Sequence, residues 1–230
     1  MDVVYVCRDG DNPELRYSLR SLSNVQHGTV HIVGGHPAWV NLDTVTVHRR
    51  PPEKTKYTTT TASVEYACQT GTVSDPFMLW NDDFYAIAPT AVQPMHRGPL
   101  NTVLRQYRTR AGAWADGLRV TTTHLKQRLP DQPLFSYELH VPLVVSKKVM
   151  LEALTFARTL PTVAPHKRTI YGNLAQLGGV QVRDPKVCHE TRSFPSGPWL
   201  SSDDSGFGSL VAPFLKSMFP DACRYEVQSR

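Results

Sequence analysis

Asn81, Asp82 and Asp83 directly follow the apolar run 77–80, so an amide and two adjacent carboxylates stand at the end of an expected strand. Hard oxygen donors of this kind favour Mg²⁺ or Mn²⁺, and carboxylates at a buried strand end are costly unless a cation or hydrogen-bond donors compensate. The same triplet is also common in solvated turns, which need no metal. Side chains alternate along a strand, so Asn81 and Asp83 are expected on one face and Asp82 on the other. We therefore predict a metal site at this position, with only some of the three side chains as direct ligands.

The segments before this triplet must form a sheet that carries it. Strand-like and helix-like patterns alternate there, which is typical of a parallel α/β sheet. Asn12 is suited to cap a helix and Pro13 to occupy its first position. The expected elements of this half are strands near 2–6, 29–33, 45–48 and 77–80 and helices at 14–23 and 61–69.

Polar residues follow three of these strands at one edge of the expected sheet. Asp9 follows the first strand, Gly34 the second, and the 81–83 triplet the strand that begins at Phe77. Ligands bind at the carboxyl ends of strands in open α/β sheets, so these three loops are expected to form one site. The basic, proline-bearing stretch 49–56 is expected to lie over phosphate groups there.

The second half of the chain adds mostly helices. The expected elements are one or two helices within 98–128, a strand at 134–142, and helices at 146–156, about 171–177 and 210–218. No repeat or linker-like tract interrupts the sequence. We therefore predict one α/β domain over 1–230, with a mostly parallel sheet and a basic helical insertion at 97–130.

Composition and charge are those of an ordinary globular chain. The 230 residues, 40% of them hydrophobic, suffice for a sizeable core, and a net charge of +5 is low for a dedicated nucleic-acid binder. Seven basic residues nevertheless fall between Arg97 and Arg128, against the single acid Asp116. The segment predicts a surface that faces an anion, and the alternative is a solvated helical face.

The cysteines and the first residues predict a cytoplasmic protein. Four cysteines lie far apart without a Cys-x-x-Cys pair, so reduced thiols are expected and a structural zinc site is not. No stretch is long and apolar enough to span a membrane, and the start lacks a basic leader.

Several blocks resemble, in order, the Stealth family of sugar-1-phosphate transferases. The opening strand with Asp9-Gly10-Asp11, the block 14–22, the segment His31-Ile32-Val33 with Pro37-Ala38-Trp39, and the stretch 77–84 are similar to the first half of the family pattern. Cys7-Arg8 stands where the family has Trp-Val. The resemblance covers most of the chain, which is short for the family.

Later blocks extend the resemblance. They are His140-Val141-Pro142, His166-Lys167-Arg168, Ser202-Asp203-Asp204, and the closing segment 214–220 with Tyr225-Glu226. The family has His-Met-Pro at the first of these and one more residue before the arginine at the second. The resemblance implies a fold related to GT-A-type glycosyltransferases, with a Rossmann-like nucleotide-sugar-binding topology.

The resemblance also implies an activity and residue roles. A metal-dependent transferase would move a sugar 1-phosphate from a nucleotide sugar, expected to be a UDP-sugar, to an acceptor hydroxyl. His140 is the expected general base, since imidazole titrates near neutral pH and Pro142 restricts the backbone before it. Arg168, helped by Lys167, is expected to bind the transferring phosphate. Mg²⁺ or Mn²⁺ is expected on Asp82, Asp83 and Asp203, the last also counted as catalytic.

Residues near the amino terminus are expected to bind the nucleotide. Asp9, Gly10 and Asp11 form the turn after the first strand, and the glycine permits close approach of the backbone. Arg16 and Arg20 lie one helical turn apart, so they either bind phosphate or decorate a solvated face.

Two alternatives remain open from the sequence. A GT-A-type glycosyltransferase would use the same fold and metal but move the sugar alone, and the fold cannot separate the two chemistries. The acceptor is a glycan or, given the arginines of 97–128, a hydroxylated base in DNA. A non-catalytic nucleic-acid-binding domain is the second alternative, although no binding motif accompanies the charge.

Overall fold

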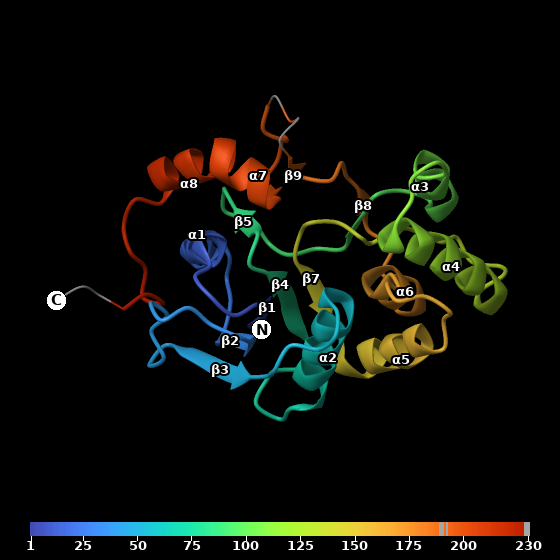
Figure 1. The fold of residues 1–230 in the computed structure, drawn as a ribbon, viewed down its shortest axis with the longest axis horizontal. Helices are drawn as coiled ribbons and strands as arrows, with labels where there is room; N and C mark the ends of the chain where they lie inside the picture. The colour runs from blue at the N-terminus through green and yellow to red at the C-terminus, as the bar shows by residue number, and fades with distance from the viewer. Residues whose placement is uncertain (189–190, 192, 228–230) are drawn as a thin grey trace.

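A central sheet of five strands organises the computed structural model, which describes residues 1–188, 191 and 193–227 (Figure 1). The first four strands are mutually parallel and the last runs antiparallel to its neighbour. This is the mostly parallel α/β sheet that the alternating pattern predicts. In spatial order its strands are β3 (Val45–Arg49), β2 (Val30–Gly34), β1 (Asp2–Cys7), β4 (Phe77–Asn81) and β7 (Leu143–Val145).

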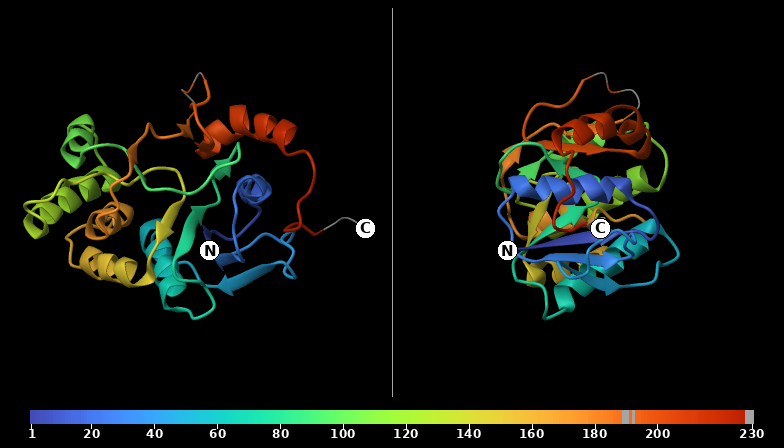
Figure 2. Two further views of the ribbon diagram at one scale, coloured as in Figure 1. Left: turned by 180° about the vertical axis from the view of Figure 1, so that it is seen from behind. Right: turned by 90° about the vertical axis from the view of Figure 1, so that its left-hand side faces the viewer.

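Helices cover both faces of this sheet. The side chains of β1 alternate, so Val3 and Tyr5 pack in the core on the side of α1 while Val4 packs in the core on the side of α2 and α5. Figure 1 shows α1 on one side of the sheet and α2 with α5 on the other, and Figure 2 gives the same layers from two further directions. The covering helices are α1 (Pro13–Ser21), the 3₁₀ turn η1 (Leu22–Asn24), α2 (Lys56–Gln69), α5 (Lys147–Arg158) and α6 (Lys167–Leu174).

The start of α1 has the predicted cap. The side chain of Asn12 accepts a hydrogen bond from the backbone N–H of Leu15 at 3.1 Å, and Pro13 is the first helical residue. The helix follows β1 through a short turn, so that turn lies at the carboxyl end of the strand.

A second, small sheet stands above α1 and carries the last helices. Its core contains Tyr85, Leu200, Val211 and Leu215. A π-helical turn precedes the final helix, which therefore begins two residues later than the apolar stripe predicts. The elements are β5 (Phe84–Ala86), β10 (Trp199–Ser202), β9 (Lys186–Val187), α7 (Asp204–Gly206), the π-helix η2 (Phe207–Val211) and α8 (Ala212–Met218).

The basic segment forms two helices, α3 (Leu100–Gln106) and α4 (Ala113–Arg128), at the end of the molecule remote from α8 (Figure 1). They share the buried core of α2 and α5. The short pair β6 (Met95–His96) and β8 (Val180–Gln181) lies at the base of this insertion. Among the described residues, no helix is both long and apolar enough to cross a membrane.

The expected strand at 134–142 is wrong. The segment is irregular apart from one isolated bridge between Pro99 and Phe135, and the strand of this region is β7. Its apolar side chains are buried as a strand's would be. The N–H groups of Ser136 and Leu139 donate to backbone carbonyls, whereas three others donate to side chains. These hydrogen bonds run from Phe135 to Asn173 (2.9 Å), from Tyr137 to Thr169 (3.1 Å) and from His140 to Asp184 (3.2 Å).

Candidate active site

A cavity of about 680 Å³ opens at the carboxyl ends of β1, β2 and β4. Loops after all three strands line it, as parallel topology requires, and the stretch 50–56 forms another wall with Arg50, Lys54 and Lys56. The end of β10 contributes from the small sheet. Of the predicted site residues, the cavity gathers Asp9, Asp82, Asp83, His140 and Asp203.

Asp82 is held under the helix cap of α1. The amide nitrogen of Asn12 donates to Oδ2 of Asp82 at 2.6 Å while its oxygen caps the helix. Burial raises the pKa of Asp82, and the neighbouring carboxylate of Asp83 raises it further. Asp82 and Asp83 have different hydrogen-bond partners and lie in the turn that follows β4, which ends at Asn81.

Asp83 is linked to the candidate base through a lysine. Its Oδ2 accepts from the hydroxyl of Ser201 at 3.3 Å and lies 3.8 Å from Nζ of Lys186. The same ammonium group lies 3.2 Å from Nε2 of His140. Since an ammonium group only donates, it occupies the lone pair of that ring nitrogen.

His140 is oriented by Asp184, a residue that the sequence analysis missed. Nδ1 of His140 lies 3.0 Å from Oδ2 of Asp184, and the backbone N–H of His140 donates to Oδ1 at 3.2 Å. A carboxylate only accepts, so Nδ1 carries the proton and Nε2 faces Lys186 with its lone pair. Burial opposes ionisation of Asp184, but hydrogen bonds and charge from His140, together with Arg97, lower its pKa. This arrangement, an imidazole with an orienting carboxylate, is one that can act as a general base.

A second cavity, of about 360 Å³, joins the first at Asn81, His140 and Lys186, which line both. Arg168 lies in its wall at 9% exposure, with its guanidinium over the ring of Phe84 at 5.7 Å. One guanidinium nitrogen donates to the carbonyl of Val141, but Nε has no hydrogen-bond partner among the described residues. Burial lowers the pKa of Arg168, yet an arginine stays charged in proteins.

Lys167 and Arg168 share one compensating carboxylate, Glu138. Nζ of Lys167 donates to the hydroxyl of Thr60, a residue of the first cavity, at 3.1 Å. Burial lowers the pKa of Lys167. Burial alone would raise the pKa of Glu138, but charge from His166, Arg168 and Lys167 lowers it. Asp184 and Asp83 also act on the charge of Arg168, so cations and carboxylates lie close together between the two cavities.

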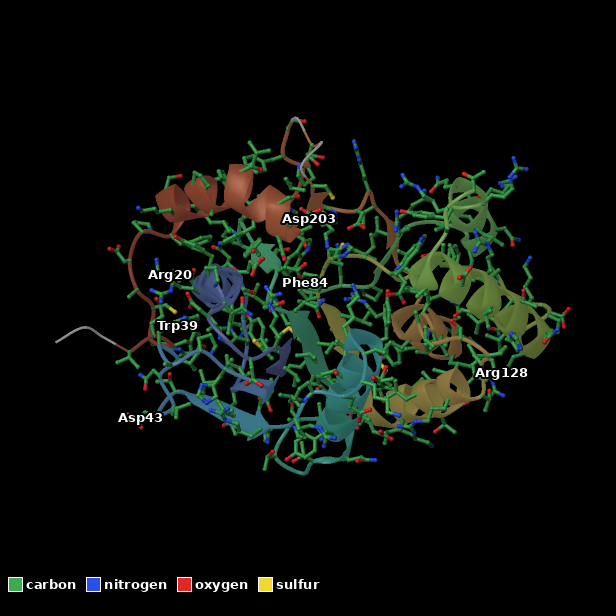
Figure 3. All side chains as sticks on the ribbon, in the orientation of Figure 1. Arg20, Trp39, Asp43, Phe84, Arg128 and Asp203 are labelled. Atoms are coloured by element: carbon green, nitrogen blue, oxygen red, sulfur yellow. The ribbon has the colours of Figure 1, made fainter. Side chains whose placement is uncertain are left out.

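Asp203 caps the short helix α7 at the edge of the first cavity. Its Oδ1 accepts from the N–H of Gly206 at 2.7 Å and from the hydroxyl of Ser205 at 2.8 Å. Burial opposes ionisation, but these hydrogen bonds, with a contribution from Cys188, lower the pKa of Asp203. Figure 3 shows Asp203 and Phe84 towards the middle of the molecule.

The turn after β1 lies only partly in the cavity. Asp9 lines it, with a carboxylate oxygen 3.8 Å from a guanidinium nitrogen of Arg49. Gly10 has φ of +104°, which favours glycine, but neither it nor Asp11 lines the cavity. The carboxylate of Asp11 instead accepts from the indole of Trp39 at 3.3 Å.

Arg16 and Arg20 lie outside both cavities. Arg20 makes a two-pronged ion pair with Glu226, at 2.6 Å from Nε and 2.8 Å from a terminal nitrogen. Arg16 lies 3.4 Å from the same carboxylate and 4.6 Å over the ring of Trp39. Figure 3 shows Arg20 and Trp39 at one side of the molecule, apart from Asp203. A partner within the chain explains these arginines without a phosphate.

The carboxylates suit a metal that is shared with a substrate. Within the described parts of the chain, no three His, Cys, Asp or Glu side chains come close enough to hold an ion by themselves. Mg²⁺ is commonly bound through one or two carboxylates together with substrate phosphates. Asp83 and Asp203, on the wall of one cavity, fit that pattern. Asp82 is less available as a ligand, because one of its carboxylate oxygens already accepts a hydrogen bond from Asn12.

Comparison with known proteins gives likenesses of fold. No family model matches the sequence, and no curated protein matches it either. A crystal structure of an active-site mutant of LgtC has a TM-score of 0.50 at 10% identity and covers 95% of each chain. A crystal structure of the galactosyltransferase LgtC with donor and acceptor sugar analogues has a TM-score of 0.49 at 13% identity, over 97% of this chain and 98% of that one. The bifunctional glycosyltransferase WbbM has a TM-score of 0.46 at 12% identity, over 96% of this chain and 43% of that one.

The fold is therefore of the GT-A glycosyltransferase type, as expected. The cavity at the carboxyl ends of its parallel strands is where such a fold binds ligands. The resemblance to the Stealth family stays a prediction from the sequence blocks, since no family model matches.

Proposed function

We propose that the protein is a nucleotide-sugar-dependent transferase that moves a sugar 1-phosphate to an acceptor hydroxyl. The observation that carries the proposal is the environment of His140. Its ring is oriented by Asp184 at the junction of two cavities, beside Lys186. Arg168 lines the second cavity, and no residue that the structure describes pairs with its Nε. A base next to cationic side chains suits attack by a hydroxyl on a phosphate.

The first cavity is the proposed donor site. Its volume of about 680 Å³ is ample for a ligand of nucleotide-sugar size. Basic side chains of the 50–56 stretch face the strand ends across it, so a diphosphate can lie between them. Asp83 and Asp203 would hold Mg²⁺ or Mn²⁺ on that diphosphate, and such an ion supplies neutralisation of the leaving phosphate.

The chain's own residues account for the proton and the bonds. The acceptor oxygen attacks the phosphorus that carries the sugar, and its proton passes to Nε2 of His140. The bond from that phosphorus to the nucleoside monophosphate breaks, and the monophosphate leaves with the electron pair. Asp184 keeps the proton of Nδ1 in place, so that Nε2 is the nitrogen available to the acceptor.

The cations support attack at phosphorus rather than attack at carbon. The phosphate oxygens carry negative charge through the transfer, so Lys186 and Arg168 stabilise it. Attack at the anomeric carbon passes through an oxocarbenium-like state with positive charge at the sugar. The same two cations, placed beside the base, would disfavour that state.

Glycosyl transfer is the second candidate, because the GT-A-type fold is compatible with both chemistries. Both reactions can start from one UDP-sugar. Sugar-phosphate transfer releases UMP, whereas transfer of the sugar alone releases UDP. The released nucleotide therefore separates the candidates without knowledge of the acceptor.

The test incubates the purified protein with nucleotide sugars and Mg²⁺ or Mn²⁺, with glycan or DNA present or absent, and separates UMP from UDP by chromatography. We expect UMP. UDP as the product supports the second candidate, and an unconsumed panel of donors refutes both. His140→Gln should abolish release, whereas His27→Gln, which changes a histidine bonded to Tyr225 outside both cavities, should not.

The metal assignment has its own measurement. Titration of Mn²⁺ in the presence of UDP, followed by electron paramagnetic resonance, should show binding that weakens at least about 10-fold in Asp83→Asn and in Asp203→Asn. Unchanged Mn²⁺ affinity in both variants would remove these carboxylates from the proposed site whatever their effect on turnover.

A further inference from the structure

Three arginines near the second cavity have no counter-charge. Arg105, Arg108 and Arg110 are exposed, and no carboxylate oxygen of the described chain lies within 4.0 Å of their guanidinium groups. Arg105 donates to the hydroxyl of Thr102 at 3.2 Å, and within 1–188, 191 and 193–227 the guanidinium groups of the other two have no hydrogen-bond partner. Most other basic residues of this insertion are paired, so the three form a distinct cationic strip.

The backbone under this strip is fixed. Arg119 donates to the backbone carbonyls of Arg108, at 3.3 Å, and of Arg110, and it also pairs with Asp116. The N–H of Arg110 donates to the carbonyl of Tyr107 at 3.1 Å. Arg119 thus fixes the backbone of the turn that carries Arg108 and Arg110. Because this backbone is already ordered, less conformational entropy is lost when a ligand binds.

The strip leads directly into the second cavity. Tyr107 stands between Arg105 and Arg108 in the chain and lines the cavity with Trp114, their ring centroids 4.7 Å apart. Arg97 donates to the hydroxyl of Tyr107 at 3.0 Å and lies 3.9 Å from Asp184. A polymer lying on the strip can therefore extend a unit past this apolar wall towards the pair of Asp184 and His140.

We propose that the acceptor is a single nucleic-acid strand, held along Arg105, Arg108 and Arg110 while one nucleotide enters the second cavity. The inference rests on the proposed function, because it makes that nucleotide the source of the acceptor hydroxyl. A nucleotide chain offers a phosphate on every unit for closely spaced arginines and a planar apolar base for the wall of Tyr107 and Trp114. An acidic glycan offers charge but no such base. The cavity, at about 360 Å³, falls within the range of ligand pockets.

The test is salt-dependent binding of a fluorescently labelled 12-nucleotide single strand, followed by anisotropy. Each neutralised phosphate contributes about 0.7 to the slope of log affinity against log salt on single strands. Replacing all three arginines by glutamine should lower the magnitude of that slope by about 2. The fold-loss of affinity on going from 50 to 200 mM salt should therefore be about 20 times smaller in this variant than in the wild type. A control with the same charge loss elsewhere, Lys126→Gln, Arg128→Gln and Lys216→Gln, should keep the wild-type slope.

The outcomes separate this inference from the proposed function. An unchanged slope in the arginine variant overturns it, and so does equal displacement of the strand by an acidic polysaccharide at equal charge. Release of nucleotide from the donor in water reports on the donor site alone and should persist in the arginine variant. If wild-type protein binds the strand but never consumes a donor, the proposed function fails instead.

Discussion

Asp184→Asn is the sharpest perturbation of the proposed chemistry, because it changes one oxygen to an NH₂ group at nearly constant volume. Asp184 accepts from Nδ1 of His140 at 3.0 Å and from its backbone N–H at 3.2 Å. An asparagine that keeps its oxygen on the backbone N–H presents its NH₂ group to Nδ1, which must then become the acceptor. The ring proton moves to Nε2, where it meets the ammonium group of Lys186.

The magnitude follows from the loss of the base. General base catalysis contributes about 10²- to 10⁴-fold, so kcat should fall by that factor, or about 3 to 5 kcal/mol in the barrier. Asp184 lines only the second cavity, so the KM of the donor should stay within about 3-fold of wild type if it reports donor binding. In Asp184→Asn, Arg97 loses the negative charge 3.9 Å away but keeps its hydrogen bond to the hydroxyl of Tyr107. The effect on folding should therefore be small.

The assay is steady-state release of nucleotide from the donor, alongside thermal unfolding. His140→Gln and the double variant of Asp184→Asn with His140→Gln complete a double-mutant cycle. Since one residue acts through the other, the double variant should be about as slow as His140→Gln alone. Turnover of Asp184→Asn within about 3-fold of wild type, or a double variant slower by the product of the two effects, would refute the proposed pairing.

Three further predictions concern residues around the site. Asn12→Ala should cost about 1 to 2 kcal/mol of unfolding free energy, measured by urea denaturation, because it removes both the helix cap and the partner of Asp82. Burial raises the pKa of Asp82, so the protein loses stability as pH rises through that raised pKa and the carboxyl group ionises. Asp82→Asn, which cannot ionise, should therefore raise the Tm at pH 7 and change it little at pH 4. Calorimetry without metal measures both values. Arg20→Gln should lower the Tm by several degrees, through loss of the ion pair with Glu226, and leave the donor KM unchanged, whereas a raised KM would restore the phosphate-binding role expected from sequence.

The parallel half of the fold could be read from the sequence because its signals are local. Asn12 and Pro13 mark the start of α1, and apolar runs mark the strands. Parallel strands place their carboxyl ends at one edge, so the convergence of Asp9 and Asp83 follows from topology without any knowledge of side chains. The stretch 49–56 is expected near phosphates because it is basic and bears prolines, and most of its residues line the cavity.

The orientation of His140 could not be read in this way. Asp184 lies 44 positions later in the chain, in a segment between two strands of only two residues each, and no motif marks it. The error at 134–142 has the same cause, since that segment is held by the side chains of Thr169 and Asn173. Alternating apolar residues showed that the segment is buried but not which groups satisfy its backbone.

Under the proposed function, the contacts of Lys186 predict that the donor binds before the acceptor. Its ammonium lies 3.2 Å from Nε2 of His140 and 3.8 Å from Asp83, so the base is occupied in the ligand-free protein. A hydrogen bond from an ammonium group to a phosphate is stronger than one to a neutral imidazole, so a bound diphosphate should draw Lys186 away and free Nε2. Initial-rate kinetics should show ordered binding in wild type and random order in Lys186→Met, with kcat lower by about 100-fold through loss of the phosphate contact. Lys216→Met, on the exposed side of α8, is the control, and ordered binding retained in Lys186→Met would contradict this role of the lysine.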